Sequence, residues 1–211
     1  MMEDEIELRD GWWWPKYDKA CYKYLKRERY VPAETATFCK KHKVIVQAGG
    51  NAGMYVKMYS DMFDTVYTFE PDPLNFYCLT KNTGSNVIKF QACLGNTRNL
   101  VNLSYERHKT IERANAGGFW ISGEGNFPIL RIDDLGLQEC DLIHLDIEGF
   151  EGEAILGAED TIRKFKPTIS VELCGHGNQF NWPDTKIIQL LNKFGYKEVA
   201  KISQDRIFQF A

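Results

Sequence analysis

The stretch VIVQAGGNAG, at residues 44–53, decides the fold of this chain. It begins with a run of apolar, β-branched residues, which predicts a buried strand. The run ends in a cluster of small residues around Asn51, and a segment compatible with a helix follows. Glycines allow a sharp turn and the close approach of a ligand, because they carry no Cβ atom. A strand, a glycine turn and a helix in this order open a nucleotide-binding α/β sheet.

The composition is that of a globular chain with ordinary apolar and charged fractions. Its 26 basic and 29 acidic side chains give a net charge of −3, which argues against nucleic acid as the main partner. No stretch approaches the ~20 apolar residues of a membrane span, and the acidic start MMEDEIELRD lacks the apolar core of a signal peptide. We therefore expect a cytoplasmic protein of unassigned oligomeric state.

The six cysteines are scattered, without a C-x-x-C pair, and we expect them to be reduced thiols. Cys174 and His176 lie two positions apart and offer two metal donors. No second cysteine pair lies near them in the sequence, and structural zinc normally takes four ligands. The sequence therefore predicts no metal site.

Beyond the glycine turn, segments typical of strands alternate with segments typical of helices. Asp72 and Pro73 mark a helix start, as an N-cap followed by proline at the first helical position. Strands are predicted at 65–69, 86–93, 100–105, 141–146 and 168–173, helices at 54–62, 73–82, 150–165 and 182–194, and a hairpin at 196–210. This order predicts a Rossmann-like, doubly wound α/β fold with a mainly parallel sheet and a C-terminal antiparallel hairpin.

Two regions are less regular. Residues 1–11 are predicted to be a frayed tail, residues 17–30 a helix ended by Pro32, and residues 34–41 a second short helix. The three tryptophans at 12–14 are expected to pack on the domain as a lid, the alternative being a wall for the acceptor. Residues 107–127 are rich in glycine and asparagine, which indicates a functional loop or a disordered insertion.

The glycine turn does not fit a dinucleotide. A dinucleotide site needs the spacing G-x-G-x-x-G, and neither Gly49 nor Gly50 begins it. Glu70 ends the second strand about twenty residues further on, where a carboxylate can take both ribose hydroxyls. A glycine turn with a ribose carboxylate but no pyrophosphate site points to S-adenosylmethionine. The simpler alternative is that the glycines only turn the chain and Glu70 only caps the next helix.

Four segments then carry a resemblance to a known family: VIVQAGGNAG, TFEPDP, LIHLDIEGFE with the ILGA that follows, and KPTISVEL. In this order and spacing, from about residue 44 to residue 173, the chain resembles the FkbM-type class I methyltransferases. The D-x-E-G-x-E run, formed by Asp146, Glu148, Gly149 and Glu151, is its most specific part. The resemblance implies S-adenosylmethionine as methyl donor and O-methylation of a hydroxyl on a sugar, glycan or natural product.

The resemblance also implies site residues. Gly49, Asn51, Gly53 and Glu70 match cofactor positions of the family, and Asp146 matches the acidic residue beside the sulfonium. The family usually has Asp at the position of Gln47 and commonly Lys at the position of His144. The complete predicted cofactor site is Gln47, Ala48, Gly49, Asn51, Gly53, Glu70, Pro71, Cys93 and Asp146. In domain terms, 1–43 is expected to be a helical and aromatic segment packed on a methyltransferase domain at 44–211.

Methyl transfer to a hydroxyl requires a group that accepts the proton. We assign Asp146 mainly to orientation of the cofactor and Glu148 to the acceptor, with His144 as the alternative base. Strand alternation puts His144 one step deeper than Asp146, so a core histidine is the expected outcome. Glu151 is expected in the first turn of the following helix. A divalent ion held by Asp146, Glu148 and Glu172 is a further alternative.

Two other functions remain open at this point. One is an NAD-dependent oxidoreductase, which the incomplete glycine spacing disfavours. The other is a non-catalytic scaffold that only binds the cofactor. The partner is expected to be a small-molecule or glycan acceptor, whose identity the sequence does not give.

Overall fold

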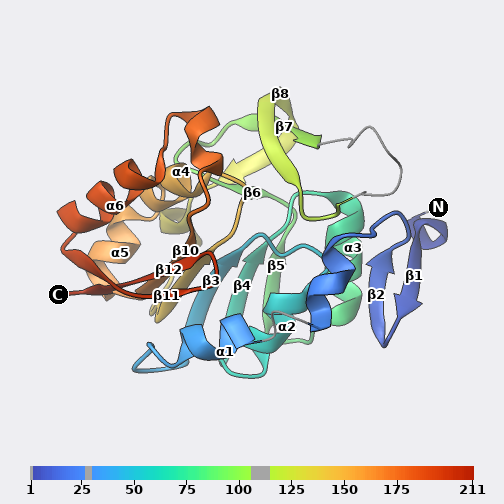
Figure 1. Ribbon diagram of the computed structural model, residues 1–211, viewed down its shortest axis with the longest axis horizontal. Coiled ribbons are helices and arrows are strands. Elements are labelled where there is room, and N and C mark those ends of the chain that lie inside the picture. Colours follow the sequence, from blue (N-terminus) through green and yellow to red (C-terminus); the bar gives the residue numbers. More distant parts are fainter. Residues whose placement is uncertain (1, 27–29, 106–114) are drawn as a thin grey trace.

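The computed structural model describes residues 2–26, 30–105 and 115–211 of the chain (Figure 1). Its main sheet has seven strands in the order β11-β12-β10-β9-β3-β4-β5. In chain order these are β3 (Val44–Ala48), β4 (Thr65–Phe69), β5 (Val87–Phe90), β9 (Leu142–Leu145), β10 (Thr168–Glu172), β11 (Tyr196–Ile202) and β12 (Asp205–Phe210).

The five strands from β10 to β5 pair in parallel, and β12 pairs antiparallel with both β10 and β11. The chain starts the sheet at β3, builds outward through β4 and β5, and then returns to place β9 on the other side of β3. This reversal between β3 and β9 is the position at which open α/β sheets bind ligands. The predicted fold class, including the C-terminal hairpin, is confirmed.

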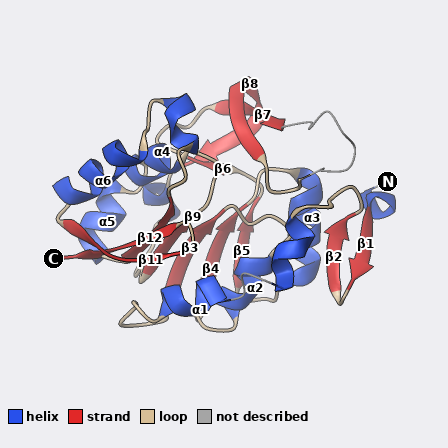
Figure 2. Ribbon diagram, in the orientation of Figure 1, coloured by secondary structure: helices blue, strands red, loops and turns tan. Residues whose placement is uncertain are grey.

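Helices cover both faces of the sheet (Figure 2). Ile45 packs with α1 (Tyr30–Ala36), α2 (Met54–Ser60) and α3 (Pro73–Asn82). Val46, the next residue of β3, belongs to the larger cluster that includes α4 (Glu151–Leu156), α5 (Glu159–Phe165) and α6 (Asp184–Lys193). Successive side chains of a strand point to opposite faces, and both faces here are covered, which explains why β3 reads as a continuous apolar run.

The N-terminal residues form a hairpin, so the prediction of a frayed tail at 1–11 is wrong. A short 3-10 helix (η1, Met2–Glu5) leads into β1 (Ile6–Arg9), which pairs antiparallel with β2 (Trp12–Pro15). The backbone N–H of Trp13 donates to Oδ1 of Asn82 on α3 at 2.9 Å. Trp14 is buried, and its Nε1–H donates to Asp18 Oδ2 at 2.6 Å. Burial of the indoles stabilises the hairpin against α3. The acidic composition of the first residues does not reveal this packing.

The helices before β3 also differ from the prediction. Residues Cys21–Lys26 form a 3-10 helix (η2), residues 27–29 lie outside the described residues, and α1 contains Pro32 in its first turn. Proline is tolerated there because the first N–H groups of a helix have no partner within it. Pro32 therefore lies near the start of a helix rather than ending one. The domain boundary at residue 43 stays a prediction.

The predicted insertion at 107–127 is partly a strand. Residues 106–114 lie outside the described residues, but β8 (Phe119–Leu130) pairs antiparallel with β7 (Leu100–Tyr105) and in parallel with β6 (Cys93–Leu94). The register of β8 shifts opposite Val101, where a Cβ on Gly125 would meet the Val101 carbonyl oxygen at 2.5 Å. The glycines that suggested a loop therefore accommodate a bulge within a strand.

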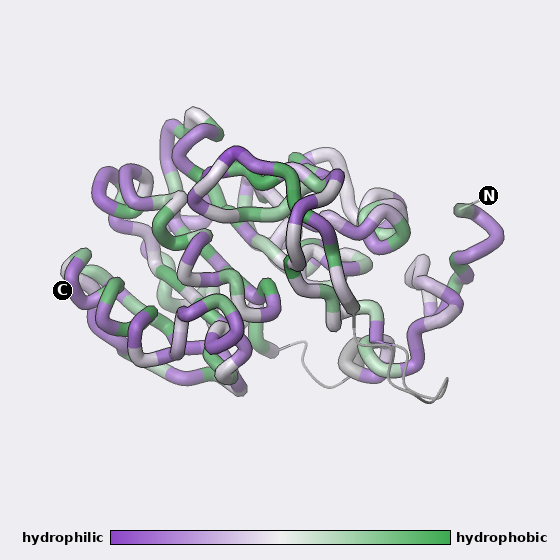
Figure 3. The backbone as a smooth tube through the Cα atoms, turned by 90° about the horizontal axis from the view of Figure 1, so that it is seen from above, coloured by the Kyte–Doolittle hydropathy of each residue, from purple (hydrophilic) through white to green (hydrophobic). Residues whose placement is uncertain are grey.

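The predicted helix at 150–165 is divided into α4 and α5. A Cβ on Gly157 would meet the Gly95 carbonyl oxygen at 2.0 Å, so the chain passes close to the loop after β6 at this point. Two 3-10 helices complete the elements, η4 (Ile132–Leu135) and η5 (His176–Phe180). The two ends of the chain lie at opposite ends of the molecule (Figure 3). Within the described residues, no helix combines the length and apolar character needed to cross a membrane.

Candidate functional site

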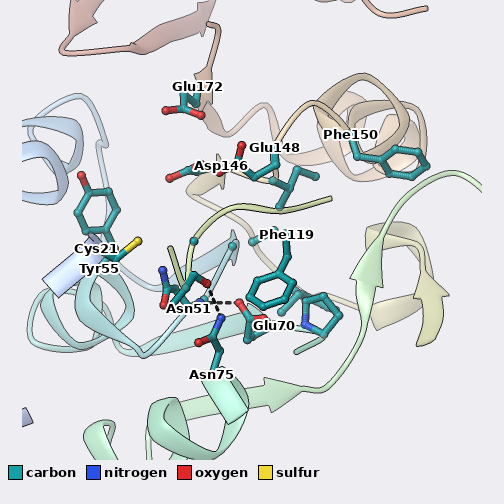
Figure 4. A pocket seen from close by; sticks show the side chains of 18 of the residues that line it. Cys21, Asn51, Tyr55, Glu70, Asn75, Phe119, Asp146, Glu148, Phe150 and Glu172 are labelled. Atoms are coloured by element: carbon teal, nitrogen blue, oxygen red, sulfur yellow. Dashed lines mark hydrogen bonds between the residues drawn. The ribbon is translucent and has the colours of Figure 1, made fainter. Parts of the chain in front are cut away.

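A cavity of about 360 Å³ opens at the carboxyl ends of β3, β4, β9 and β10 (Figure 4). Its volume is in the range of small-molecule sites. The structure brings most of the predicted cofactor residues to this pocket, namely Ala48, Gly49, Asn51, Glu70, Pro71, Cys93 and Asp146. Aromatic side chains, including those of Tyr55, Phe119 and Phe150, lie around the same space.

The glycine turn is shaped by a close approach between β3 and β9. Gly49 has φ +84°, and a Cβ there would lie 1.8 Å from the backbone carbonyl oxygen of Asp146. The N–H groups of Gly49 and Gly50 both donate to the Phe69 carbonyl, at 3.2 and 2.9 Å. Only glycine fits at position 49, because any side chain would collide with backbone. The turn therefore fixes how Asp146 lies relative to β3.

Glu70 is a buried carboxylate held by backbone donors. Its Oε2 accepts from the Asn51 N–H at 2.7 Å, and its Oε1 accepts from the Asp72 N–H at 2.9 Å. Burial raises the pKa of Glu70 to about 8, against the opposing effect of these hydrogen bonds. Asp72 is the predicted N-cap of α3, accepting from the Leu74 and Asn75 N–H groups at 3.1 and 2.9 Å. Glu70 is thus fixed in position but desolvated, which favours pairing with hydroxyl or N–H donors of a ligand.

Asn75 lies beside Glu70 and has an unfilled acceptor (Figure 4). Its Nδ2 donates to the Ala116 carbonyl at 2.7 Å, whereas its buried Oδ1 has no hydrogen-bond partner in the described part of the chain. A buried acceptor without a partner is costly unless a ligand supplies a donor. Glu70 and Asn75 therefore offer hydrogen-bond acceptors, and neither supplies a positive charge that would bind a phosphate. This fits a nucleoside ligand without phosphate. The residues present fit S-adenosylmethionine.

The D-x-E-G-x-E run folds into a tight loop after β9. Glu151 is buried, and its Oε1 accepts from the N–H groups of Ile147 and Gly149 at 3.0 and 3.1 Å. Gly149 has φ +102°, and a Cβ there would lie 2.5 Å from the carbonyl oxygen of His176. Glu148 itself has φ +54°, which is uncommon for a side chain of its size. Glu151 therefore begins α4 as predicted and also shapes the loop that presents Glu148.

The opposite wall of the pocket is acidic. Asp146, Glu148 and Glu172 gather there from β9 and β10 (Figure 4), and Asp205 at the start of β12 also lines the cavity. Burial, followed by the charges of Glu172 and Asp205, raises the pKa of Asp146 well above its usual range. Burial, followed by the charge of Glu148, raises the pKa of Glu172 to about 7. No lysine or arginine lines the pocket among residues 2–26, 30–105 and 115–211.

Two predicted cofactor residues lie outside the pocket wall. Gln47 is fully buried beneath the turn, where its Nε2 donates to the Ala48 and Gly49 carbonyls at 3.0 Å each. Its Oε1 accepts from Thr68 Oγ1 at 2.6 Å. Gly53 has φ +94° and precedes α2. Both residues support the shape of the turn rather than line the cavity.

His144, the alternative base, also lies outside the pocket wall. It is fully buried, with Nδ1 2.8 Å from the Tyr59 hydroxyl and Nε2 3.1 Å from Asp205 Oδ1. Tyr55 stacks on its ring, with the centroids 5.7 Å apart. Nδ1 therefore has a hydrogen-bond partner within the protein, whereas Nε2 lies near the Asp205 carboxylate without a hydrogen bond to the described residues. The ring occupies the core position that strand alternation predicts.

Sequence reasoning did not assign Asn75, His176 or Asp205 to the site. Asn75 could have been found, because it lies in the first turn of the helix that follows Glu70. Asp205 reaches the pocket because β12 inserts between β10 and β11, an order that no local pattern encodes. His176 lies in the loop after β10, which closes against Gly149.

This chain is similar to solved structures of low sequence identity. A precorrin 8W decarboxylase from Methanobacterium thermoautotrophicum shares 14% identity, with a TM-score of 0.51 over 86% of this chain and 89% of that chain. An FkbM methyltransferase from Methylobacillus flagellatus shares 18% identity, with a TM-score of 0.49 over 81% of this chain. The match spans 44% of the length of the Methylobacillus protein. No curated protein matches this chain in sequence.

The family is given by the sequence itself. The model of the methyltransferase FkbM domain matches residues 47–198, most of the chain. This range contains the glycine turn, Glu70, the D-x-E-G-x-E loop and β10, which form much of the pocket described above. The chain therefore belongs to the FkbM methyltransferase family.

Proposed function

We propose that this chain transfers a methyl group to a hydroxyl of an uncharged or cationic acceptor, of the sugar, glycan or natural-product class. The cofactor is S-adenosylmethionine, which supplies a methyl group activated on a sulfonium. The observation that carries the proposal is one pocket with the Glu70 carboxylate at one wall and the carboxylates of Asp146 and Glu148 at the other.

At the first wall, Glu70 accepts hydrogen bonds from the ribose hydroxyls and Asn75 Oδ1 accepts from a further donor of the cofactor. The backbone N–H groups of Asn51 and Asp72 hold the Glu70 carboxylate for this task. The glycine turn brings the backbone close to the ligand. Asp146 orients the cofactor from the opposite side, where a cationic sulfur would lower the raised pKa of this carboxyl and favour its charged form.

At the second wall, Glu148 accepts the proton of the acceptor hydroxyl. Its carboxylate lies beside those of Asp146 and Glu172, and its Oε2 lies 2.8 Å from His176 Nδ1, which positions the carboxylate at the pocket. Positioning the hydroxyl and excluding water are the remaining tasks, for which the aromatic lining is suited. The same acidic wall disfavours acceptors that carry phosphate, sulfate or carboxylate groups near the reacting hydroxyl.

Titration calorimetry with S-adenosylmethionine, S-adenosylhomocysteine and NAD tests the cofactor. We expect binding of the first two and none of NAD, and tight NAD binding would favour the oxidoreductase alternative. Transfer of labelled methyl to a panel of glycosides and natural-product alcohols, each paired with a phosphorylated analogue, tests the acceptor. Preference for the phosphorylated members would contradict the proposal. Cofactor binding without transfer to any member would favour the scaffold.

A further inference from the structure

A second set of chemically active groups lies next to the acidic wall. One ligand-type atom each from Glu172, Cys174 and His176 lies within 4.8 Å of the other two. We propose that these three residues bind a divalent transition-metal ion of the zinc class. The sequence predicts no metal site because Cys174 and His176 alone supply two donors. The third donor comes from the end of β10, two positions before Cys174.

The donor set selects the kind of ion. A thiolate, an imidazole and a carboxylate are the ligands that zinc takes in proteins, whereas magnesium and calcium prefer oxygen alone. Three protein ligands with an open fourth position are typical of catalytic zinc sites, and structural sites have four. This cluster therefore fits a site that also accepts a small ligand.

The interactions of His176 and Cys174 also support metal binding. His176 Nδ1 lies 2.8 Å from Glu148 Oε2, a pairing that leaves Nε2 for an ion. Histidines that bind metal usually pair the ring nitrogen that does not bind the metal with a carboxylate. Cys174 Sγ donates to Glu172 Oε2 at 3.6 Å. Metal binding removes such a proton, because the thiolate is the ligand. The geometry thus contains both the carboxylate–histidine pair and a thiol–carboxylate pair that a cation would replace.

The loop that carries Cys174 and His176 is held by close backbone packing. The Gly175 N–H donates to Asp184 Oδ1 at 3.1 Å. A Cβ on Gly177 would lie 2.1 Å from the Trp182 carbonyl oxygen, and a Cβ on Gly149 would lie 2.5 Å from the His176 carbonyl oxygen. The loops after β9 and β10 are therefore fixed against one another. Donor atoms on such loops are positioned before an ion arrives, which lowers the cost of binding.

The place of the ion suggests its task, and this step rests on the proposed function. Glu172 and His176 line the same pocket as Glu148. An acceptor hydroxyl at the open position would have a lowered pKa, because a divalent cation stabilises the alkoxide. The O–H bond breaks, the proton goes to the Glu148 carboxylate, and the electron pair stays on the oxygen. The ion thus makes a weakly acidic hydroxyl a nucleophile at neutral pH.

Metal binding is tested without reference to activity. Protein freed of metal by dialysis against a chelator is titrated with Zn²⁺ in competition with a chromophoric chelator. We expect one tight site per chain. The variants Cys174→Ala and His176→Ala should weaken it by more than the roughly 10–100-fold that loss of an outer-shell partner costs. Cys21→Ala is the matched control, since Cys21 is a partly exposed cysteine that lines the pocket away from this cluster.

Cobalt provides a second readout. Co²⁺ in the wild-type site should give the intense ligand-field absorption of tetrahedral coordination and a thiolate-to-cobalt charge-transfer band, and Cys174→Ala should abolish that band. Wild type without a tight stoichiometric site, or variants that bind like wild type, would overturn the proposal. Circular dichroism and calorimetry with S-adenosylmethionine on each variant report folding and cofactor binding. Failure of the metal site is thereby distinguished from failure of the methyltransferase assignment.

Discussion

The two walls of the pocket are built in different ways. The cofactor wall is made by backbone geometry around one buried carboxylate, with Gly49 against Asp146 and the N–H groups of Asn51 and Asp72 on Glu70. The acceptor wall is made by side chains from three strand ends, among them Asp146, Glu172 and Asp205. Figure 4 shows Asp146, Glu148 and Glu172 on the opposite side of the cavity from Glu70 and Asn75.

The difference concerns what each wall has to recognise. S-adenosylmethionine is the same ligand in every enzyme that uses it, so its site can be built from fixed backbone groups. An acceptor differs between enzymes that share a fold, and side chains at the ends of strands can change without changing the sheet. Substitutions at the two walls should therefore separate cofactor binding from turnover.

The largest expected effect is on turnover at the acceptor wall. We expect Glu148→Gln to lower turnover by roughly 10²–10⁴-fold, the usual contribution of a general base, while affinity for S-adenosylmethionine stays near that of wild type. Initial rates and calorimetry on the same preparation measure both. Glu139→Gln, at an exposed carboxylate just before β9, is the control and should change neither. Unchanged turnover in Glu148→Gln would remove this residue from the chemistry.

The next effect is on the cofactor wall. Gly49→Ala places a Cβ against the Asp146 carbonyl oxygen and forces a strained φ, so the turn must move. We expect affinity for S-adenosylmethionine to fall by about 100-fold, equivalent to about 2.7 kcal/mol. Gly136→Ala is the matched control, because Gly136 also has positive φ but its Cβ would meet nothing within 4 Å. Equal effects from both would mean that strain, and not the contact with β9, explains the glycine.

The same contrast explains how much the sequence could predict. The cofactor wall follows from local patterns, because a strand, a glycine turn and Glu70 some twenty residues on are adjacent in the fold. The acceptor wall depends on strand order, which brings Asp205 of β12 beside Glu172 of β10. Sequence patterns do not reveal the N-terminal hairpin or residues 119–127 of β8, because their stability comes from indole burial and a bulge, both of which need tertiary partners.

Glu70 provides a pH-dependent test of the cofactor wall. Its pKa is raised by burial from 4.5 to about 8, so between these values the folded chain keeps a proton that the unfolded chain has lost. This contribution to stability is complete below pH 4.5 and is lost as pH rises through 8. Each pKa unit corresponds to about 1.4 kcal/mol, so Glu70→Gln without ligand should become the more stable protein at high pH by a few kcal/mol.

The same substitution should weaken cofactor binding, although it increases stability at high pH. Above pH 8, where Glu70 is ionised, Glu70→Gln loses a charge-assisted acceptor worth roughly 1.5–3 kcal/mol, so affinity for S-adenosylmethionine should fall by about 10–100-fold. Thermal denaturation of both proteins from pH 5 to pH 9, with and without ligand, measures the two effects. Parallel stability curves for wild type and variant would show that Glu70 does not titrate in this range.

The smallest expected effect on ligand binding is at Gln47, and it tests whether this side chain supports the turn or contacts the cofactor. Gln47→Leu removes the donors to the Ala48 and Gly49 carbonyls, and buried groups left without partners cost about 1–3 kcal/mol. We therefore expect a loss of stability in urea denaturation, with little change in affinity for S-adenosylmethionine. Gln138→Leu, at an exposed glutamine, is the control. The opposite result, lost affinity at unchanged stability, would mean that Gln47 contacts the cofactor as the sequence predicts. The cofactor wall would then include the Gln47 side chain in addition to those of Glu70 and Asn75.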